Sequence, residues 1–411
     1  MKNTNQYWLI IYPHVFVSRV GMSKVLLYNS QNGESIETND KEIINLVDKL
    51  HEETNLGSVL LEDNIFDNEA ILFFVNESKL KGICNVIRFS PNLPRPIQLM
   101  PVLSIQKDIE KLKKQPNSII GEDLLNYLSE ITINVSDQCN QKCQFCHEAC
   151  KQLTYCTSSE DGKYSLKLED LKLIANQILQ APIRRINIIG GDLSKYELMP
   201  ELLDVFEKYN EVIHIWEYYQ LNIIRYNGLL DILVDFPIEK SKFNVLLNEI
   251  KTKKTTFHFL VTNDVEVQEA ESIVDECDLM NFELHPFFDN INIDFFKKNI
   301  YLNKEDIFVE PIVQRKIFCN QVLNSNHFGC LTIKSNGDVY ANINASKLGN
   351  INDRKLLDII SSEISINTSW RVIRDQEPCS ECLYQFLCPP PSNYEYIIGE
   401  NSLCTVKFMR P

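Results

Sequence analysis

Apolar and polar residues alternate in two ways along this chain, and the change of pattern divides it into regions. Residues 7–17, 24–30 and 34–37 form three strand-like runs, and residues 41–53 place apolar side chains at the 3.6-residue spacing of an amphipathic helix. The first hundred residues therefore predict an N-terminal α+β domain, residues 1–105, in which three strands precede helices.

A connector is expected next, because proline and charge replace the apolar periodicity. The segment PNLPRP occupies 91–96 and the segment DIEKLKKQPN occupies 108–117. Such compositions are typical of linkers. We place the linker at residues 106–130.

From residue 131 to residue 310, short strands alternate with helices. The six predicted strands are ITINVS, RINIIGG, VIHIWEYY, DILVDFP, TFHFLVT and FELHPFF. Repeated βα units predict a parallel sheet with crossover helices, and six strands are fewer than the eight of a closed barrel. We therefore expect an α/β fold, an open partial (β/α)6 barrel whose active site lies at the carboxyl ends of the strands.

After residue 311 the alternation weakens into the hairpin-like segment CLTIKSNGDVYAN and a cysteine-rich tail. We expect residues 311–411 to form a small metal-stabilised domain. A chain of 411 residues is long enough for two or three domains, each with its own core.

Composition narrows the range of partners. The net charge of −15 disfavours nucleic acid and anionic membranes, because an acidic surface repels phosphates. No apolar run is long enough to span a bilayer. Pro13 and His14 interrupt the one N-terminal run that could serve as a signal sequence. We expect a cytoplasmic protein that binds a peptide or a small molecule.

Thirteen cysteines gather mainly in two groups with ligand-like spacing, which favours metal or cluster binding over disulfides. In the first group, Cys139, Cys143 and Cys146 follow the first strand of the βα region as C-x3-C-x2-C. Three thiolates can hold three irons of a [4Fe–4S] cluster and leave the fourth iron open. The alternative is a zinc site completed by His147 or Cys150.

Phe145 directly precedes Cys146, and with it the motif resembles the signature of the radical S-adenosylmethionine superfamily. The resemblance implies that Cys139, Cys143 and Cys146 carry a catalytic [4Fe–4S] cluster. Its open iron would take the amino and carboxylate groups of S-adenosyl-L-methionine, with Phe145 against the adenine. One electron would then yield a 5′-deoxyadenosyl radical. Cys150 and Cys156 are expected to be bystanders.

Gly190, Gly191 and Asp192 end the next predicted strand. They resemble the Gly-Gly-Glu-Pro element of the same superfamily, which implies that they bind the methionyl amine. Asp192 replaces the glutamate of that element, and Leu193 replaces its proline. An ordinary turn is the alternative. Asp235 ends a later strand and is interpreted as a capping or solvated aspartate, with a ribose or substrate contact as the alternative.

The second group, C-x2-C-x5-C with a distal cysteine, resembles the SPASM/twitch auxiliary-cluster domain of radical enzymes that modify peptides. The resemblance implies at least one auxiliary [4Fe–4S] cluster, and a zinc ribbon is the alternative. The implied ligands are Cys379, Cys382, Cys388 and Cys404.

A second auxiliary cluster is not expected in its usual form. The resemblance places two of its cysteines at positions where this chain has Asn342 and Ser392. Cys319 and Cys330 remain nearby in the sequence, but two thiolates rarely hold a cubane alone. We expect one complete auxiliary site.

The N-terminal pattern resembles the PqqD-like, winged-helix-like domain that captures leader peptides by adding them as a strand to a sheet edge. An accessory packing or dimerisation domain is the alternative.

Together these resemblances imply an oxidoreductase-type radical maturase. Its partners would be a ribosomally made precursor peptide with a leader, and an electron donor such as flavodoxin or ferredoxin. The product could be a carbon–carbon, thioether or ether crosslink, or an epimer. Two alternatives stay open: a sulfatase-type protein maturase, and a non-catalytic peptide-binding scaffold with zinc or structural cluster sites.

Overall fold

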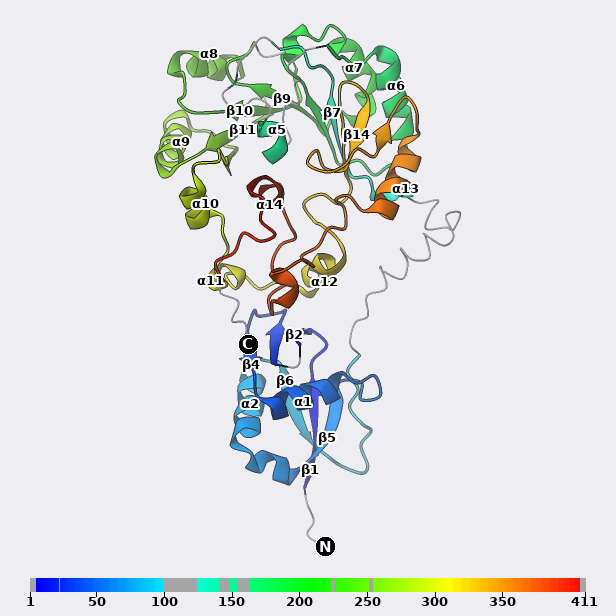
Figure 1. Ribbon diagram of the computed structural model, residues 1–411, viewed down its shortest axis with the longest axis vertical. Helices are drawn as coiled ribbons and strands as arrows, with labels where there is room; N and C mark the ends of the chain where they lie inside the picture. Colours follow the sequence, from blue (N-terminus) through cyan, green and yellow to red (C-terminus); the bar gives the residue numbers. More distant parts are fainter. Residues whose placement is uncertain are drawn as a thin grey trace.

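The computed structural model describes residues 5–21, 23–99, 124–139, 143, 148–153, 163–222, 226–250 and 254–406. Figure 1 shows the N-terminal domain at one end, a large sheet with its helices at the other, and C-terminal segments between them. None of the helices in these described parts is both long enough and apolar enough to cross a membrane.

The described residues of the N-terminal domain form two three-stranded antiparallel sheets and two α-helices. In one sheet β1 lies between β5 and β6, and in the other β3 lies between β2 and β4. The elements are β1 (Gln6–Ile11), β2 (Val15–Val20), β3 (Lys24–Asn29), β4 (Ser35–Thr38), α1 (Lys41–His51), β5 (Ser58–Glu62), a 3-10 turn (Asp63–Asp67), α2 (Glu69–Leu80) and β6 (Cys84–Arg88).

The prediction of three strands before the helix is wrong in one respect. The apolar run 7–17 is two strands rather than one, and these belong to different sheets. Pro13 has no backbone N–H to donate to a ladder, and a turn forms there in which the Val15 N–H donates to the Tyr12 carbonyl at 3.1 Å. The helix predicted at 41–53 is confirmed as α1, which Asp40 caps by accepting from the N–H of Glu42 at 2.8 Å.

A nine-stranded sheet forms the centre of the molecule, in the order β12-β11-β10-β9-β8-β7-β13-β14-β15. The six predicted strands are confirmed as the parallel strands β7 to β12, side by side in chain order. They are β7 (Glu130–Asn134), β8 (Arg185–Ile189), β9 (Ile213–Tyr218), β10 (Leu229–Val234), β11 (Lys254–Val261) and β12 (Phe282–Pro286).

Each parallel strand presents alternate residues to opposite faces of the sheet. One parity is apolar and joins a single buried cluster with residues of the flanking helices. Its members include Ile131, Ile133, Ile186, Ile188, Ile213, Ile215, Leu230, Ile232, Phe257 and Phe259. The other parity is largely polar, with Thr132 on β7, Asn187 on β8, His214 on β9, Asp231 on β10 and His258 on β11. The sheet therefore has one apolar face, which packs in the core, and one largely polar face.

Helices cover the apolar face (Figure 1). The three helices predicted from the βα pattern, at residues 168–179, 199–209 and 266–277, are confirmed in position, and a further helix between β10 and β11 was not predicted. On α9, Asn263 accepts from the N–H of Val265 at 3.0 Å at the start, and Asp278 ends the helix with a φ of 50°. The helices are α6 (Leu168–Gln177), α7 (Met199–Val205), α8 (Lys240–Ile250) and α9 (Asp264–Cys277), with short turns at Leu124–Tyr127, Leu193–Lys195 and Glu207–Tyr209.

The C-terminal hairpin joins the same sheet. β13 pairs in parallel with β7, and β14 and β15 follow as antiparallel strands. Strands from before and after the boundary predicted at residue 311 therefore belong to one hydrogen-bonded sheet. The elements are α5 (Ala149–Gln152), α10 (Ile293–Asn299), α11 (Lys304–Ile307), α12 (Gln314–Val322), β13 (Cys330–Ile333), β14 (Asp338–Tyr340), β15 (Gly349–Asn350), α13 (Leu356–Ile366), a turn at Cys379–Glu381, and α14 (Asn393–Ile398).

The N-terminal domain packs on the C-terminal region through its second sheet. Leu26 and Tyr28 of β3 share an apolar cluster with Leu383 and Leu387. The Tyr28 hydroxyl accepts from the N–H of Ile312 at 2.7 Å. Sheet β2-β3-β4 therefore lies against the cysteine-rich tail.

Trp370 anchors the C-terminal region to the sheet, and its removal should be strongly destabilising. It is fully buried, and its indole donates to the carbonyl of Cys330 on β13 at 2.8 Å. We expect Trp370→Ala to lower the free energy of unfolding by about 3–5 kcal/mol, measured from the urea midpoint. Leu357→Ala, at a 37% exposed site on α13, is the control, and an equal loss in both variants would contradict the assignment.

Candidate functional site

Main-chain hydrogen bonds join the loop that follows β7 to the loop that follows β8. The Gly191 N–H donates to the Ser136 carbonyl at 2.9 Å, and the Asp192 N–H donates to the Gln138 carbonyl at 2.8 Å. β7 and β8 are parallel, so both loops leave the same edge of the sheet. Cys139 is thereby held next to the predicted glycine motif.

The close approach of these two loops requires glycine at position 191. A Cβ atom there would lie 2.5 Å from the Gln138 carbonyl oxygen and 2.7 Å from the Cβ of Cys139. At Gly190 the nearest atom is Cδ2 of Leu193 at 2.6 Å, a side-chain end that can turn away. The absence of a side chain at Gly191 therefore lets backbone meet backbone beside the cysteine loop.

Asp137 ties the cysteine loop to the C-terminal hairpin. Its buried carboxylate accepts from Asn134 Nδ2 at 3.1 Å and from the hydroxyl of Ser335, in the β13–β14 turn, at 2.6 Å. The sequence analysis missed both Asp137 and Ser335. Their pairing depends on β13 lying beside β7, which the sequence did not indicate.

Tyr218 and Asp235 lie at the same edge of the sheet. The Tyr218 hydroxyl donates to Asp235 Oδ1 at 2.8 Å. Burial raises the pKa of Tyr218, and the negative charge of Asp235 raises it further.

The interpretation of Asp235 as a capping or solvated aspartate is wrong. Its residue is only 7% exposed, and burial raises its carboxyl pKa. The carboxyl group faces Tyr218 and lies several residues before α8 begins at Lys240. Its position at a strand end was the signal that pointed to the alternative, a contact within the site.

Asp192 is buried beside the cysteine loop and has local partners. Ser194 donates its hydroxyl to Oδ1 at 2.5 Å, and Lys195 Nζ lies 3.1 Å from Oδ2. The predicted residues Phe145, Cys146, His147 and Cys156 lie outside the described residues. Cys150 lies on α5.

Four tail cysteines line one pocket, together with Arg374 and Tyr384. Main-chain N–H groups donate to two of the sulfur atoms, from Tyr384 to Cys382 at 3.4 Å and from Val406 to Cys404 at 3.3 Å. Such N–H···S bonds stabilise thiolates that bind iron. The tail cysteines that the structure brings together are Cys379, Cys382, Cys388 and Cys404.

The thiol groups of Cys382 and Cys388 are costly to ionise in this pocket. Burial, with the charges of neighbouring cysteines, raises the pKa of Cys382 to about 11 and that of Cys388 to about 12. A cationic metal centre removes this penalty, because it stabilises the thiolates directly. The pocket therefore disfavours free thiolates, and a bound metal centre would offset that cost.

The spacing of the four tail thiols exceeds that of a single zinc ion. All four are described, and no three of their sulfur atoms lie within 4.8 Å of one another. Thiolates around one zinc ion, with Zn–S bonds of about 2.3 Å, would be roughly 3.8 Å apart. The sulfur atoms as they lie are therefore farther apart than the ligands of one zinc ion.

Hydrogen-bonding side chains occupy the expected positions of a second auxiliary cluster. Asn342 donates to Asn393 Oδ1 at 2.7 Å and contacts His327 Nε2 at 3.1 Å. Ser392 caps α14 by accepting from the Tyr394 N–H at 3.2 Å. Cys330 is on β13, where burial raises its thiol pKa to about 12.

A row of polar side chains crosses the sheet face opposite the helices, and the sequence analysis did not predict it. Asp231 is at its centre, with His214 on one side and His258 on the other. The polar residues inside the segments IHIWEY, LLDILV and TFHFLV were the available signal, since they recur at alternate positions.

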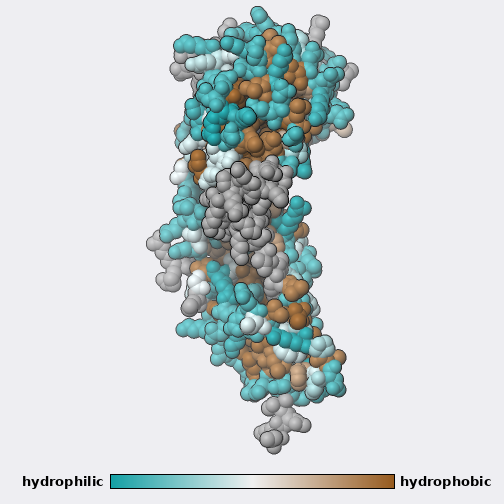
Figure 2. Space-filling view, turned by 90° about the vertical axis from the view of Figure 1, so that its right-hand side faces the viewer, coloured by the Kyte–Doolittle hydropathy of each residue, from teal (hydrophilic) through white to brown (hydrophobic). Residues whose placement is uncertain are grey.

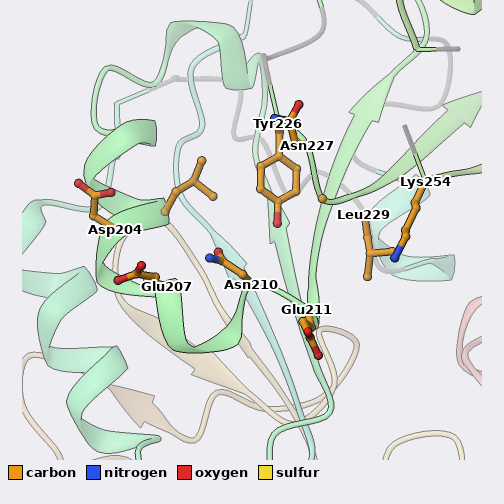
Figure 3. A pocket seen from close by; sticks show the side chains of 10 residues that line it. Asp204, Glu207, Asn210, Glu211, Tyr226, Asn227, Leu229 and Lys254 are labelled. Atoms are coloured by element: carbon orange, nitrogen blue, oxygen red, sulfur yellow. The ribbon is translucent and has the colours of Figure 1, made fainter. Parts of the chain in front are cut away.

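The pocket in Figure 3 lies at the opposite edge of the sheet. Asn210 and Glu211 precede β9, Gly228 precedes β10, and Lys254 begins β11. Parallel sheets bind substrates at the carboxyl ends of their strands, whereas these residues are at the amino ends. We assign this acidic pocket no part in the site.

No protein-family model and no curated protein matches the chain. Among solved structures, Streptococcus suis SuiB bound to precursor peptide SuiA matches with a TM-score of 0.48 and 17% identity over 96% of this chain and 97% of that chain. SuiB bound to S-adenosylmethionine matches with a TM-score of 0.46 and 15% identity over the same shares. Both TM-scores lie below 0.5, so function is inferred from the residues of this chain alone.

The two glycines of the motif should respond differently to alanine. We expect Gly191→Ala to push the cysteine loop away, which lowers the free energy of unfolding by about 1–3 kcal/mol and speeds alkylation of Cys139 in metal-free protein. Gly190→Ala is the matched control, because Leu193 can turn aside. Alkylation is measured by peptide mass spectrometry, and equal rates in both variants would contradict the close approach.

His327 should make the protein less stable in acid. Burial lowers its pKa to about 4, so it stays neutral in the fold while an unfolded chain takes up a proton below about pH 6.5. Stability should fall as pH drops from 6.5 to 4, by on the order of 2–3 kcal/mol from this residue. Urea midpoints against pH should show a shallower loss for His327→Gln than for His14→Gln. Parallel profiles would refute the assignment.

Proposed function

We propose that this chain is a radical S-adenosylmethionine enzyme that modifies a ribosomally synthesised precursor peptide. The observation that carries the proposal is the main-chain attachment of the Cys139 loop to Gly191 and Asp192. Cys139, the first cysteine of the C-x3-C-x2-C motif, thus lies beside the glycine motif, some fifty residues away in sequence, at one carboxyl edge of a parallel sheet. An ordinary turn at GGD does not require this contact.

The residues present fit the proposed cofactors. Cys139, Cys143 and Cys146 would hold a [4Fe–4S] cluster, and Phe145 would lie against the adenine of S-adenosylmethionine. When bound, the cluster and S-adenosylmethionine would supply one-electron cleavage and a radical able to abstract hydrogen from the peptide.

Asp192 would bind the methionyl amine through its buried carboxylate. Lys195 holds that carboxylate from a side chain that is 40% exposed, so Lys195 can turn into solvent and give up its place to the amine. Aspartate is one carbon shorter than the glutamate of the resembling motif. The close approach at Gly191 brings the backbone of Asp192 nearer to the cysteine loop, which would offset the shorter reach of the aspartate side chain.

Asp137, Tyr218 and Asp235 would hold the site in shape. Asp137 fixes the start of the cysteine loop through Asn134 and Ser335. Tyr218, neutral because its pKa is raised, donates to Asp235 at the same edge of the sheet. These hydrogen bonds would limit movement of the loop when a peptide enters.

The tail cysteines would carry one auxiliary [4Fe–4S] cluster. Four ligands leave no open iron, so its role would be to transfer electrons or to position the peptide. Arg374 lies 4.0 Å from the sulfur of Cys379 and forms an ion pair with Glu395 at 2.7 Å. The positive guanidinium would balance part of the negative charge of a thiolate-bound cluster.

The N-terminal domain would bind the leader of the peptide. Both of its sheets are three-stranded, and each has edge strands to which an extended peptide can add. Figure 2 shows a face on which hydrophobic patches interrupt the hydrophilic surface. The chain is strongly acidic at −15, which suits a basic or neutral peptide better than nucleic acid. Flavodoxin or ferredoxin is the proposed class of electron donor.

The cysteine motif decides the proposed function. We expect anaerobically purified protein to contain iron and sulfide at both sites and to form 5′-deoxyadenosine from S-adenosylmethionine and a reductant. Replacing Cys139, Cys143 and Cys146 by alanine should reduce the rate of 5′-deoxyadenosine formation by roughly 1000-fold or more, because the catalytic centre is lost. The iron bound by the tail cysteines should remain.

The matched control replaces Cys319 by alanine, a thiol on α12 outside both proposed ligand sets. It should keep the iron of both sites and the cleavage activity. A zinc-loaded, iron-free protein that never cleaves S-adenosylmethionine would support the scaffold alternative and overturn the proposal. Loss of all iron in the triple variant would contradict two independent sites.

A further inference from the structure

Asp231 organises a group of histidines on the polar face of the sheet. Its carboxylate is almost fully buried and accepts from His214 Nδ1 at 2.7 Å and from His258 Nε2 at 2.8 Å, while Arg185 lies 3.3 Å away. A carboxylate in contact with these donors stays ionised and accepts hydrogen bonds only. The proton shared with His258 is therefore on Nε2 of that ring.

This fixes the other nitrogen of His258 as a lone-pair donor. With Nε2 protonated, the Nδ1 atom of a neutral ring is free to bind a proton or a metal ion. Trp216 stacks against the His258 ring with centroids 4.4 Å apart, which restrains its orientation. A carboxylate behind a histidine is the arrangement that orients metal-binding histidines in proteins.

Two further ligand atoms converge on His258 Nδ1. His285 Nε2 lies 2.9 Å from it, Glu283 Oε2 lies 3.6 Å from it, and those two atoms are 3.3 Å apart. Ligands at about 2.0–2.1 Å from a tetrahedral zinc ion are roughly 3.4 Å from one another. The three distances bracket this value, so an ion can bind with movements of a few tenths of an ångström.

We propose that His258, Glu283 and His285 form a binding site for one divalent transition-metal ion such as Zn²⁺, with Asp231 orienting His258. Two imidazoles and one carboxylate make up a common ligand set for zinc and for other first-row divalent ions. No other set of three or more histidine, cysteine or carboxylate ligand atoms comes within 4.8 Å across the described parts of the chain. His285 needs only to move its proton from Nε2 to Nδ1 in order to bind.

The site is open on one side. β12 is the edge strand of the sheet, and the side chain of Glu283 is 59% exposed while that of His258 is 4% exposed. An ion can therefore enter past Glu283, and water or another ligand can complete its coordination. None of these residues belongs to the cysteine sites, so the proposal is independent of the proposed function.

The experiment compares zinc stoichiometry in the full chain. Anaerobically purified wild type, His285→Ala and Glu283→Gln are dialysed against limiting Zn²⁺, and zinc and iron are counted per chain by mass spectrometry. All variants keep the thirteen cysteines, so zinc bound by thiols cancels in the comparison. Glu271→Gln, an exposed acid on α9, is the matched control.

We expect His285→Ala to bind one zinc ion fewer than wild type, with iron content unchanged, and Glu283→Gln to bind that ion at least 10-fold more weakly. Zn²⁺ should raise the melting temperature of wild type and of Glu271→Gln, but not that of His285→Ala. Asp231→Asn should weaken zinc binding about 10–100-fold if it acts by orienting His258.

Equal zinc stoichiometry in wild type and folded His285→Ala would overturn the proposal and leave a hydrogen-bonded network only. Glu283→Gln keeps the outcome decisive if His285→Ala does not fold, because Glu283 is at the surface. If wild-type protein binds zinc at this site but forms no 5′-deoxyadenosine, the result would instead count against the proposed function.

Discussion

Two main-chain hydrogen bonds, from Gly191 to Ser136 and from Asp192 to Gln138, are the constraint on which the candidate active site depends. They are made by backbone groups, so substitutions that keep the glycine leave them in place. They require that two loops meet with no Cβ between them. Because parallel strands share one carboxyl edge, the cysteine loop lies at the same edge of the sheet as Tyr218 and Asp235.

The C-terminal region is connected to this edge rather than appended to it. β13 continues the sheet beside β7, and Ser335 reaches the carboxylate of Asp137 at 2.6 Å. On its other side, the same region contacts the N-terminal domain, where the Tyr384 hydroxyl donates to Glu37 at 2.5 Å next to the tail cysteines. The C-terminal region therefore contacts both the N-terminal domain and the cysteine loop of the sheet.

Sequence reasoning predicted what local periodicity and ligand spacing determine. Six parallel strands, the helix at α1 and the convergence of the four tail cysteines are all confirmed. It could not predict the pairing of β13 with β7, since two hundred residues separate Glu130 from Cys330 and no local pattern specifies long-range partners. It divided the first domain wrongly because apolar residues on both sides of Pro13 resemble one strand, and it took Asp235 for a surface residue because strand ends are usually exposed.

The polar face of the sheet explains how the register of its last strands is specified. Asp231 and Ile232 are adjacent on β10, and only one parity places the carboxylate among His214 and His258 while Ile232 enters the core. A slip of one residue would bury the carboxylate against the helices without partners and would place the isoleucine among polar side chains. Hydrogen bonds from neighbouring strands lower the pKa of Asp231 to about 2, although burial alone would raise it. Since those donors exist only in the native register, the buried charge selects one alignment of β9, β10 and β11, which an apolar residue at the same position would not do.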